Sequence, residues 1–517
     1  MSQHHLKDDS DSISTAHSLF AKAREELIAN EKSLRSDHKF CSNLSPTAQK
    51  ACTIVSKIRA EERKTIWSTT SSPDLQKTEI FPGMMFNIAK EYMETTKLWK
   101  IVLKMPKGAL LHCHLGAMVD LHWVFNAALS EKGMCISATE PLSSPDVREK
   151  AGIKFAFSKT PHENGCSIWS EKYEPNTFVP VTVAADSYPD GGRGGWVRWM
   201  KDRCSITQSE SLDHHLGIDD VWRKLNAAFA IVPGIVYYEP VMRKFLREFF
   251  RTLLKDGVRW VKFRTAPFTR FVLEGQEEAC SDPSGVMRAI AEEIEGFKRN
   301  MRECIRLKKD YPDVISGYDL VGHEDSGRTL RSLTPELLWF QSECRQQQVN
   351  IPFFFHAGEC VGDGDETDEN LFDAILFGTR RLGHAFSLYK HPTLIDLVKQ
   401  KSILVESCPI SNEVLRYTAS IMSHPLPALL ARGVPAALSN DDPALLGQGT
   451  SGMTHDFWQA LQGWENLGLE GLGSLAQNSV RWSAFEDEGA EEWEVNTREG
   501  EDGSGIRADR IKAWNAE

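Results

Sequence analysis

The chain has 517 residues, of which 41% are hydrophobic and 26% are charged, and its formal net charge is −12. A chain of this length and composition can bury a large core, which excludes a disordered or fibrous protein. The negative net charge gives no bulk attraction to nucleic acid or to an anionic membrane, so we expect a small molecule as the binding partner.

The N-terminal sequence predicts a cytoplasmic protein. Met1–Ser10 are polar and acidic, without the apolar segment of a secretory signal, and no stretch of the chain is long enough to span a bilayer. Eleven cysteines are an odd number, so at least one thiol is unpaired, and we expect most to be reduced. A bridge between Cys135 and Cys166 is the alternative for an exported protein.

Residues 1–104 are predicted to form a helical extension. Leu19–Glu31 and Phe86–Leu103 have apolar residues at spacings of three and four, which indicates a helix face packed against something. Such an extension serves either as structural support or as a dimerisation arm. Pro106 and Gly108 then end the helix, and the first strand follows.

Residues 105–483 are predicted to alternate strands with helices, interrupted by an insertion at about 126–233. The glycine-rich stretch Gly191–Gly195 suggests that this insertion is a subdomain or lid that shapes substrate access. Beyond it, Pro240–Asp256 and Met287–Lys309 are expected to be helices. Besides the strand that leads to His112, six more are expected: Arg259–Arg264, Ile315–Gly322, Ile351–Phe355, Arg381–His384, Ile403–Glu406 and Val434–Leu438.

The predicted fold class is α/β, a TIM-type (β/α)8 barrel of the metallo-hydrolase kind with the helical extension and the inserted subdomain. Such a barrel has eight strands, and one is missing between Arg264 and Gly317. Phe268–Leu273 could serve as an unusual strand, but a deletion is the favoured interpretation. After Ser483, residues 484–517 form an acidic, glycine-containing tail that we expect to be disordered.

Histidines and a carboxylate follow the predicted strands, at the ends where a barrel gathers its catalytic groups. His112 and His114 are two residues apart, so on a strand both side chains leave the same face. Each of these short motifs is by itself weak evidence for a metal site. Together with His356 and Asp441, however, the chain offers three imidazoles and a carboxylate. Such a set holds zinc and leaves room for a water, whose pKa the metal lowers to about 7.

The motifs resemble those of the adenosine deaminase superfamily and, within it, the adenosine deaminase-related growth factor branch that contains the secreted animal adenosine deaminases. The resemblance covers roughly residues 90–483 and rests on the segments Met105–Gly108, Gly317–Asp325, Phe355–Glu359 and Cys408–Asn412, the last followed by His424-Pro425. The insertion falls where that branch has its receptor-binding domain. Because the relatives are secreted, export is the alternative to the cytoplasmic address.

The resemblance implies one zinc ion per chain, a purine nucleoside substrate and a homodimer formed through the helical N-terminus. It implies His112, His114, His356 and Asp441 as the zinc ligands. His384 would orient the attacking water and take its proton, while Glu359 would protonate purine N1 as hydroxide adds at C6.

The same resemblance implies the substrate contacts. Asp442 would contact purine N7, and the backbone amide of Gly322 would contact N3. Residues 222–229 resemble the substrate-contacting helix of the branch, which makes Trp222 and Phe229 further substrate-binding candidates.

The predicted activity is hydrolytic deamination of adenosine and 2′-deoxyadenosine to inosine and ammonia. Gly116 stands where the classical intracellular adenosine deaminases place an aspartate, so an adenine nucleotide remains an alternative substrate. A catalytically impaired binding or growth-factor protein is the second alternative. The missing strand favours it, whereas retention of all four ligands together with Glu359 and His384 opposes it.

Overall fold

The structure is a computed structural model that describes residues 3–67, 80–160, 166–213, 215–265, 271–278, 301–302, 304–310 and 312–517, with side chains from residue 15 onward. Parallel strands form its centre. They are β1 (Gly108–Leu110) and β5 (Val258–Val261) in one sheet, and β6 (His356–Ala357), β7 (Arg381–His384), β8 (Leu404–Ser407) and β9 (Ala436–Leu438) in another.

Two isolated bridges extend these sheets into one series. Cys113 bridges Asp441 in parallel, which places β1 beside β9. Tyr318 bridges Phe353, just before β6, and the Tyr318 amide donates to the Pro352 carbonyl at 2.9 Å. The order is therefore β5, β1, β9, β8, β7, β6 and then the segment at Tyr318, which is the order of an eight-stranded β/α barrel with one position open.

The open position lies between β5 and the Tyr318 segment. Among the described residues, no backbone hydrogen bond joins residues 258–265 to residues 315–320. Of the alternative strand Phe268–Leu273, residues 268–270 lie outside the described part, and Val272 instead bridges Tyr238. The predicted α/β class is confirmed. The missing strand stays a prediction, because residues 266–270 and 279–300 lie outside the described part of the chain.

Helices surround the strands because each has one apolar face. In α13 (Glu239–Lys255), Val241, Phe245, Phe249 and Leu253 recur every four residues and are buried. Of the predicted helix at 287–309, residues 287–300 lie outside the described part, and residues 301–302 and 304–309 are helical. The other barrel helices are α15 (Thr334–Gln346), α16 (Asn370–Leu376), α17 (Pro392–Gln400), α18 (Pro409–Val414), α19 (Leu426–Ala431), α20 (Gly452–Gly463) and α21 (Gly468–Arg481).

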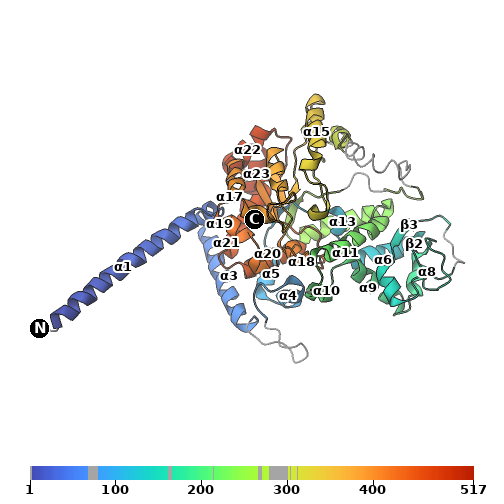
Figure 1. The fold of residues 1–517 in the computed structure, drawn as a ribbon, viewed down its shortest axis with the longest axis horizontal. Coiled ribbons are helices and arrows are strands. Elements are labelled where there is room, and N and C mark those ends of the chain that lie inside the picture. Colours follow the sequence, from blue (N-terminus) through green and yellow to red (C-terminus); the bar gives the residue numbers. More distant parts are fainter. Residues whose placement is uncertain are drawn as a thin grey trace.

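The N-terminal extension is helical, as predicted. It contains α1 (Gln3–Ser33), α2 (His38–Ser42), α3 (Pro46–Thr65), α4 (Phe86–Met93) and α5 (Lys97–Lys104). The single helix expected at 86–103 is two helices, because Thr96 caps α5 by accepting from the Trp99 amide. Helix α1 projects from the body, and Leu19 and Leu27 are 65% and 71% exposed, so the face expected to be packed has no partner in the described part of this chain (Figure 1).

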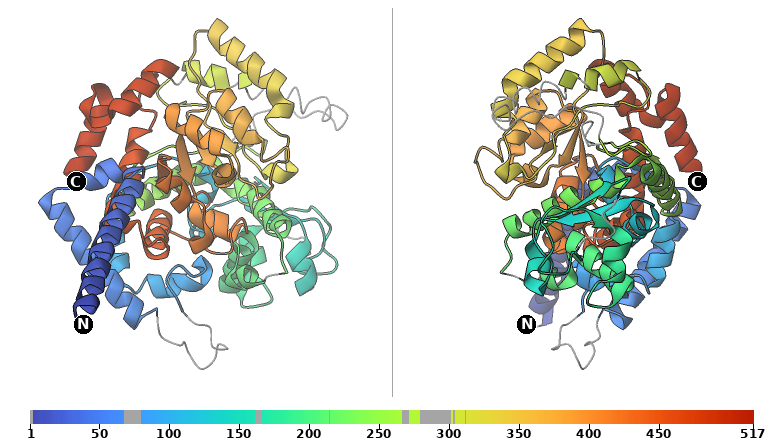
Figure 2. Two further views of the ribbon diagram at one scale, coloured as in Figure 1. Left: turned by 60° about the vertical axis from the view of Figure 1, so that its left-hand side comes forward. Right: turned by 90° about the vertical axis from the view of Figure 1, so that its right-hand side faces the viewer.

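The insertion is a small subdomain of its own, on the side of the molecule opposite α1 (Figure 1). Its antiparallel sheet has the order β3 (Ile153–Phe157), β2 (Met134–Ala138), β4 (Val179–Pro180), and it faces the viewer in the right-hand view of Figure 2. Cys135 is buried on β2 and Cys166 is exposed, and neither forms a disulfide. The helices near and within the insertion are α6 (Leu121–Ser130), α7 (Pro145–Lys150), α8 (Val181–Asp186), α9 (Gly192–Cys204), α10 (Gln208–Leu212), α11 (Ile218–Ile231) and α12 (Pro233–Val236).

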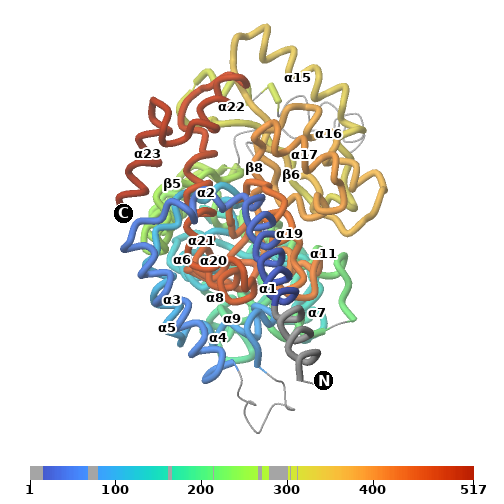
Figure 3. The backbone as a smooth tube through the Cα atoms, turned by 90° about the vertical axis from the view of Figure 1, so that its left-hand side faces the viewer, coloured from blue at the N-terminus to red at the C-terminus, as the bar shows by residue number. Residues whose placement is uncertain are grey.

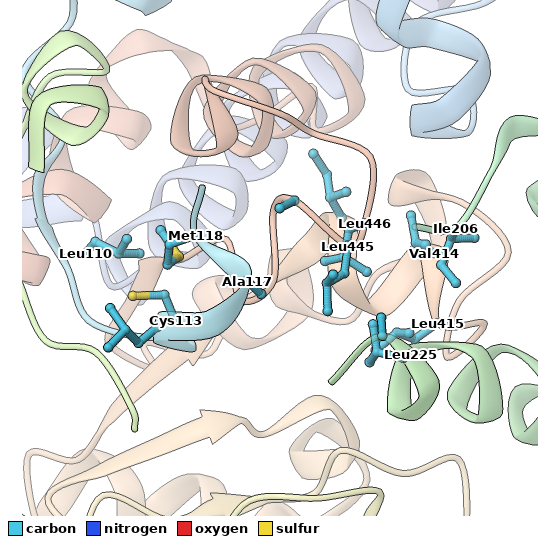
Figure 4. Close-up of a cluster of buried hydrophobic side chains, with 14 of the residues drawn as sticks. Leu110, Cys113, Ala117, Met118, Ile206, Leu225, Val414, Leu415, Leu445 and Leu446 are labelled. Carbon is cyan, nitrogen blue, oxygen red and sulfur yellow. The ribbon is translucent and has the colours of Figure 1, made fainter. Parts of the chain in front are cut away.

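Apolar contacts fasten the insertion to the barrel. Leu225 of α11 lies beside Leu415, and Ile206 lies beside Val414 at the end of α18 (Figure 4). The Ile206 amide also donates to the Leu445 carbonyl at 2.8 Å. Helix α11 is thereby held against the loops that follow β8 and β9.

The expectation of a disordered tail at 484–517 is wrong. Helices α22 (Ala490–Glu499) and α23 (Gly505–Ala516) form there, and α23 packs on α21 (Figure 3). Trp493 is 3% exposed, and the guanidinium carbons of Arg380 and Arg507 lie 4.9 and 4.6 Å from ring centroids of its indole. A few buried side chains among many acidic ones hold this segment against the barrel, and the acidic composition gave no sign of them.

Within the described part of the chain, every helix is too short or too polar to cross a bilayer.

Candidate metal centre and active site

Side chains from four strand ends meet at the carboxyl side of the barrel. His112 follows β1, His356 begins β6, His384 ends β7 and Asp441 follows β9. His384 and Asp441 have φ values of 60° and 56°, a left-handed conformation that is unfavourable for residues with a side chain. The barrel holds both in this conformation, as functional sites often do.

Three imidazoles and one carboxylate form a cluster that fits a metal ion. The His112 ring centroid is 4.4 Å from that of His356, and His112 Nε2 is 3.4 Å from Asp441 Oδ1. His112, His114 and Asp441 have ligand atoms within 4.8 Å of one another. The Nε2 atoms of His112, His114 and His356 and Oδ1 of Asp441 are all buried without a hydrogen-bond partner.

Unpartnered buried polar atoms are costly, and their concentration at one place favours a bound cation. Three imidazole nitrogens and one carboxylate oxygen, with space left for a water, are a donor set that suits zinc. The residues predicted as metal ligands are thus brought together.

Two carboxylates orient these imidazoles from behind. Glu406 Oε2 lies 3.0 Å from His112 Nδ1, and Asp319 Oδ2 lies 2.8 Å from His356 Nδ1. With Nδ1 donating to a carboxylate, each ring presents the lone pair of Nε2 to the cluster. Burial lowers the pKa of His356 to about 4, which keeps the ring neutral and able to bind a metal.

Arg264 joins the two orienting carboxylates across the open position of the barrel. Its Nε donates to Asp319 at 2.6 Å and its Nη2 to Glu406 at 2.7 Å, while Nη1 donates to the Leu111 carbonyl at 3.0 Å. Lys262, the residue after β5, donates to Ser316 Oγ at 2.9 Å. Side chains that follow β5 therefore reach the Tyr318 segment, where the described residues show no backbone pairing.

The roles of Glu406, Asp319 and Arg264 were missed in the sequence. What could have identified these residues is a charged side chain within or beside an apolar strand, because a buried charge requires a partner. Ser411 was missed as well, and its hydroxyl donates to Asp441 Oδ2 at 2.6 Å.

Glu359 and His384 lie beside the cluster as a pair. Glu359 Oε1 is 3.5 Å from His384 Nδ1, and both side chains are nearly inaccessible to solvent. Burial, reinforced by the carboxylates of Asp441 and Glu324, raises the pKa of Glu359 well above its usual value. Burial and the neighbouring His112 lower the pKa of His384 well below its usual value. These shifts favour a carboxyl group that holds a proton it can donate, and an uncharged imidazole.

Two of the predicted substrate-binding residues, Asp442 and Phe229, lie beside His114. Asp442 is buried, with Oδ1 at 3.2 Å from His114 Nδ1, and burial together with Asp441 raises the pKa of Asp442 to about 6. Phe229 of α11 lies with its ring centroid 6.3 Å from that of His114. Gly322 lies on an exposed loop, with open space where a side chain would be.

Trp222 contacts two residues, His323 and Tyr417, that the sequence analysis did not single out. Its ring stacks on His323, the neighbour of Gly322, at 4.8 Å with 8° between the planes. Its Nε1 donates to the Tyr417 hydroxyl at 2.9 Å. Helix α11 of the insertion thus contributes Trp222 and Phe229 to the same region.

The chain is similar to known proteins over much of its length. The family described as adenosine deaminase matches residues 206–494, more than half of the chain. Adenosine deaminase 2 of Sus scrofa is 30% identical over 458 residues, covering 83% of this chain and 85% of that protein. Adenosine deaminase 2-A of Danio rerio is 28% identical, covering 81% and 83%. Among solved structures, adenine deaminase from Arthrobacter aurescens aligns with 80% of this chain and all of its own at 17% identity, with a TM-score of 0.49. The chain therefore belongs to the adenosine deaminase family.

Proposed function

We propose that this protein catalyses the zinc-dependent, hydrolytic deamination of adenosine and 2′-deoxyadenosine to inosine and ammonia. The observation that carries the proposal is the juxtaposition of the buried Glu359, whose pKa burial raises, with three unpartnered imidazole nitrogens and the unpartnered Oδ1 of Asp441. The similarity to adenosine deaminases over more than four-fifths of this chain supports it.

His112, His114, His356 and Asp441 would hold the metal. A zinc ion bound there supplies hydroxide at neutral pH by lowering the pKa of water to about 7. Glu359 would donate its proton to purine N1 as C6 is attacked, and His384 would orient the attacking oxygen. Purine N7 is an acceptor, so its contact with Asp442 requires a proton on that carboxyl, and the raised pKa of Asp442 is consistent with this requirement.

Zinc content and substrate preference test the proposal together. We expect about one zinc per chain, turnover of adenosine and 2′-deoxyadenosine, loss of turnover after chelation and recovery when zinc is restored. Adenosine monophosphate serves as the comparison substrate. Faster turnover of the monophosphate than of adenosine would identify a nucleotide as the substrate. A zinc-loaded chain that deaminates neither compound would indicate a binding protein.

We propose further that α1 is the arm of a homodimer. Leu19, Phe20 and Leu27 are 65%, 68% and 71% exposed on a helix that projects from the body (Figure 1), and an apolar helix face of this kind needs a partner. Light scattering should give twice the chain mass for the full protein and the single mass after deletion of residues 1–33. Zinc content is the folding control, and an unchanged mass after deletion would contradict the assignment.

A further inference from the structure

A series of buried side chains links His384 to a backbone amide that is remote from the metal ligands. The Leu426 amide donates to His424 Nδ1 at 3.1 Å, and His424 Nε2 lies 3.0 Å from Asn412 Oδ1. Asn412 Nδ2 in turn lies 3.1 Å from His384 Nδ1. The three side chains are at most 6% exposed, so each polar atom depends on its neighbour in the series rather than on water.

The direction of every hydrogen bond in this series follows from its first donor. A backbone amide can only donate, so His424 Nδ1 accepts and carries no proton. Burial lowers the pKa of His424 to about 3, so the ring is neutral and its one proton is on Nε2. That proton needs an acceptor, which turns the carbonyl oxygen of Asn412 toward His424 and the amide nitrogen of Asn412 toward His384.

We propose that His424 and Asn412 are positioning residues that hold the ring proton of His384 on Nε2. The Asn412 amide hydrogen needs a lone pair, which His384 Nδ1 supplies, so the proton of the neutral ring is on the other nitrogen. His384 Nε2 is 3.9 Å from Asp441 Oδ2, on the side of the metal-ligand cluster. Glu359 Oε1, 3.5 Å from Nδ1, faces the nitrogen that carries no proton, which suits a protonated carboxyl group.

In this tautomer His384 donates a hydrogen bond toward the attacking oxygen and cannot take a proton at Nε2. The expectation that His384 also takes the proton of the attacking water is therefore replaced by an orienting role. This consequence for turnover depends on the proposed function, whereas the position of the ring proton does not.

Nitrogen-15 NMR of histidine-labelled, zinc-loaded full-length protein measures that position directly. We expect the wild-type His384 signal, assigned by its loss in His384→Gln, to report a proton on Nε2 and none on Nδ1. In Asn412→Asp the carboxylate can accept from both histidines, so His384 Nδ1 should gain a proton. A proton on Nδ1 in the wild type, or an unchanged His384 signal in Asn412→Asp, would overturn the proposal.

Two substitutions of His424 separate positioning from packing. Glutamine can accept from the Leu426 amide and donate to Asn412, so His424→Gln should keep kcat within about threefold, whereas His424→Leu should lower it about 10- to 100-fold with little change in KM. His391→Leu is the matched control, because His391 pairs with Asp368 at 3.1 Å and lies outside the series. Equal losses in the Gln and Leu variants would contradict the proposal. If the wild type deaminates no purine, the proposed function fails and the NMR experiment still decides the proton position.

Discussion

Replacing Asp441 by alanine is expected to remove both the metal and the activity. Asp441 is the single carboxylate in the proposed ligand set, and it is 3% exposed. Its loss would leave three imidazoles as the only protein ligands, without a negative charge to compensate that of a divalent ion. We expect zinc affinity to fall by more than about 100-fold, beyond the loss usual for residues that only orient ligands. Competition with a chromogenic chelator measures the affinity.

The control for this variant is Asp363→Ala, the same substitution at an exposed position. It should leave zinc affinity and turnover unchanged. If Asp441→Ala retained stoichiometric zinc and wild-type turnover, the ligand assignment would be wrong.

Replacing Glu359 by glutamine is expected to stop catalysis while leaving the metal in place. Glutamine keeps the shape of the side chain, but its amide cannot transfer a proton to purine N1. Loss of a positioned proton donor lowers rates about 100- to 10,000-fold, so kcat should fall by that factor with KM changed far less. Steady-state kinetics, with zinc content measured on the same sample, separate the two effects.

Glu366→Gln is the matched control, because Glu366 is exposed on the loop that follows the active-site glutamate. Turnover by Glu359→Gln above about a tenth of wild type would exclude Glu359 as the proton donor. Loss of zinc in that variant would instead make Glu359 part of the metal site.

Predictions that depended on local pattern agree with the structure. His112 and His114 both follow β1 and both lie near Asp441 Oδ1, and apolar runs marked where β7, β8 and β9 would form. The lack of β-rich sequence between Arg264 and Gly317 matches the place where the described residues show no backbone pairing. Each of these features concerns neighbours along the chain.

Predictions about context were less successful. The tail at 484–517 is helical because Trp493 and Ile511 find a surface to pack on, which its acidic composition did not reveal. The face of α1 at Leu19 and Leu27 was expected to be packed, yet a single chain leaves it exposed. Periodicity shows that a helix has an apolar face but does not identify its partner.

The sequence by itself determined which residues could hold a metal and on which strand ends they stand, because strand periodicity and turn chemistry are local properties. Only the tertiary structure decided which carboxylates orient His112 and His356, and how Arg264 connects those carboxylates. It also decided the series of hydrogen bonds from the Leu426 amide through His424 and Asn412, which we propose fixes the ring proton of His384. These contacts join residues that are far apart in the chain. Burial makes them obligatory, because each desolvated polar atom must find a partner wherever the fold brings one.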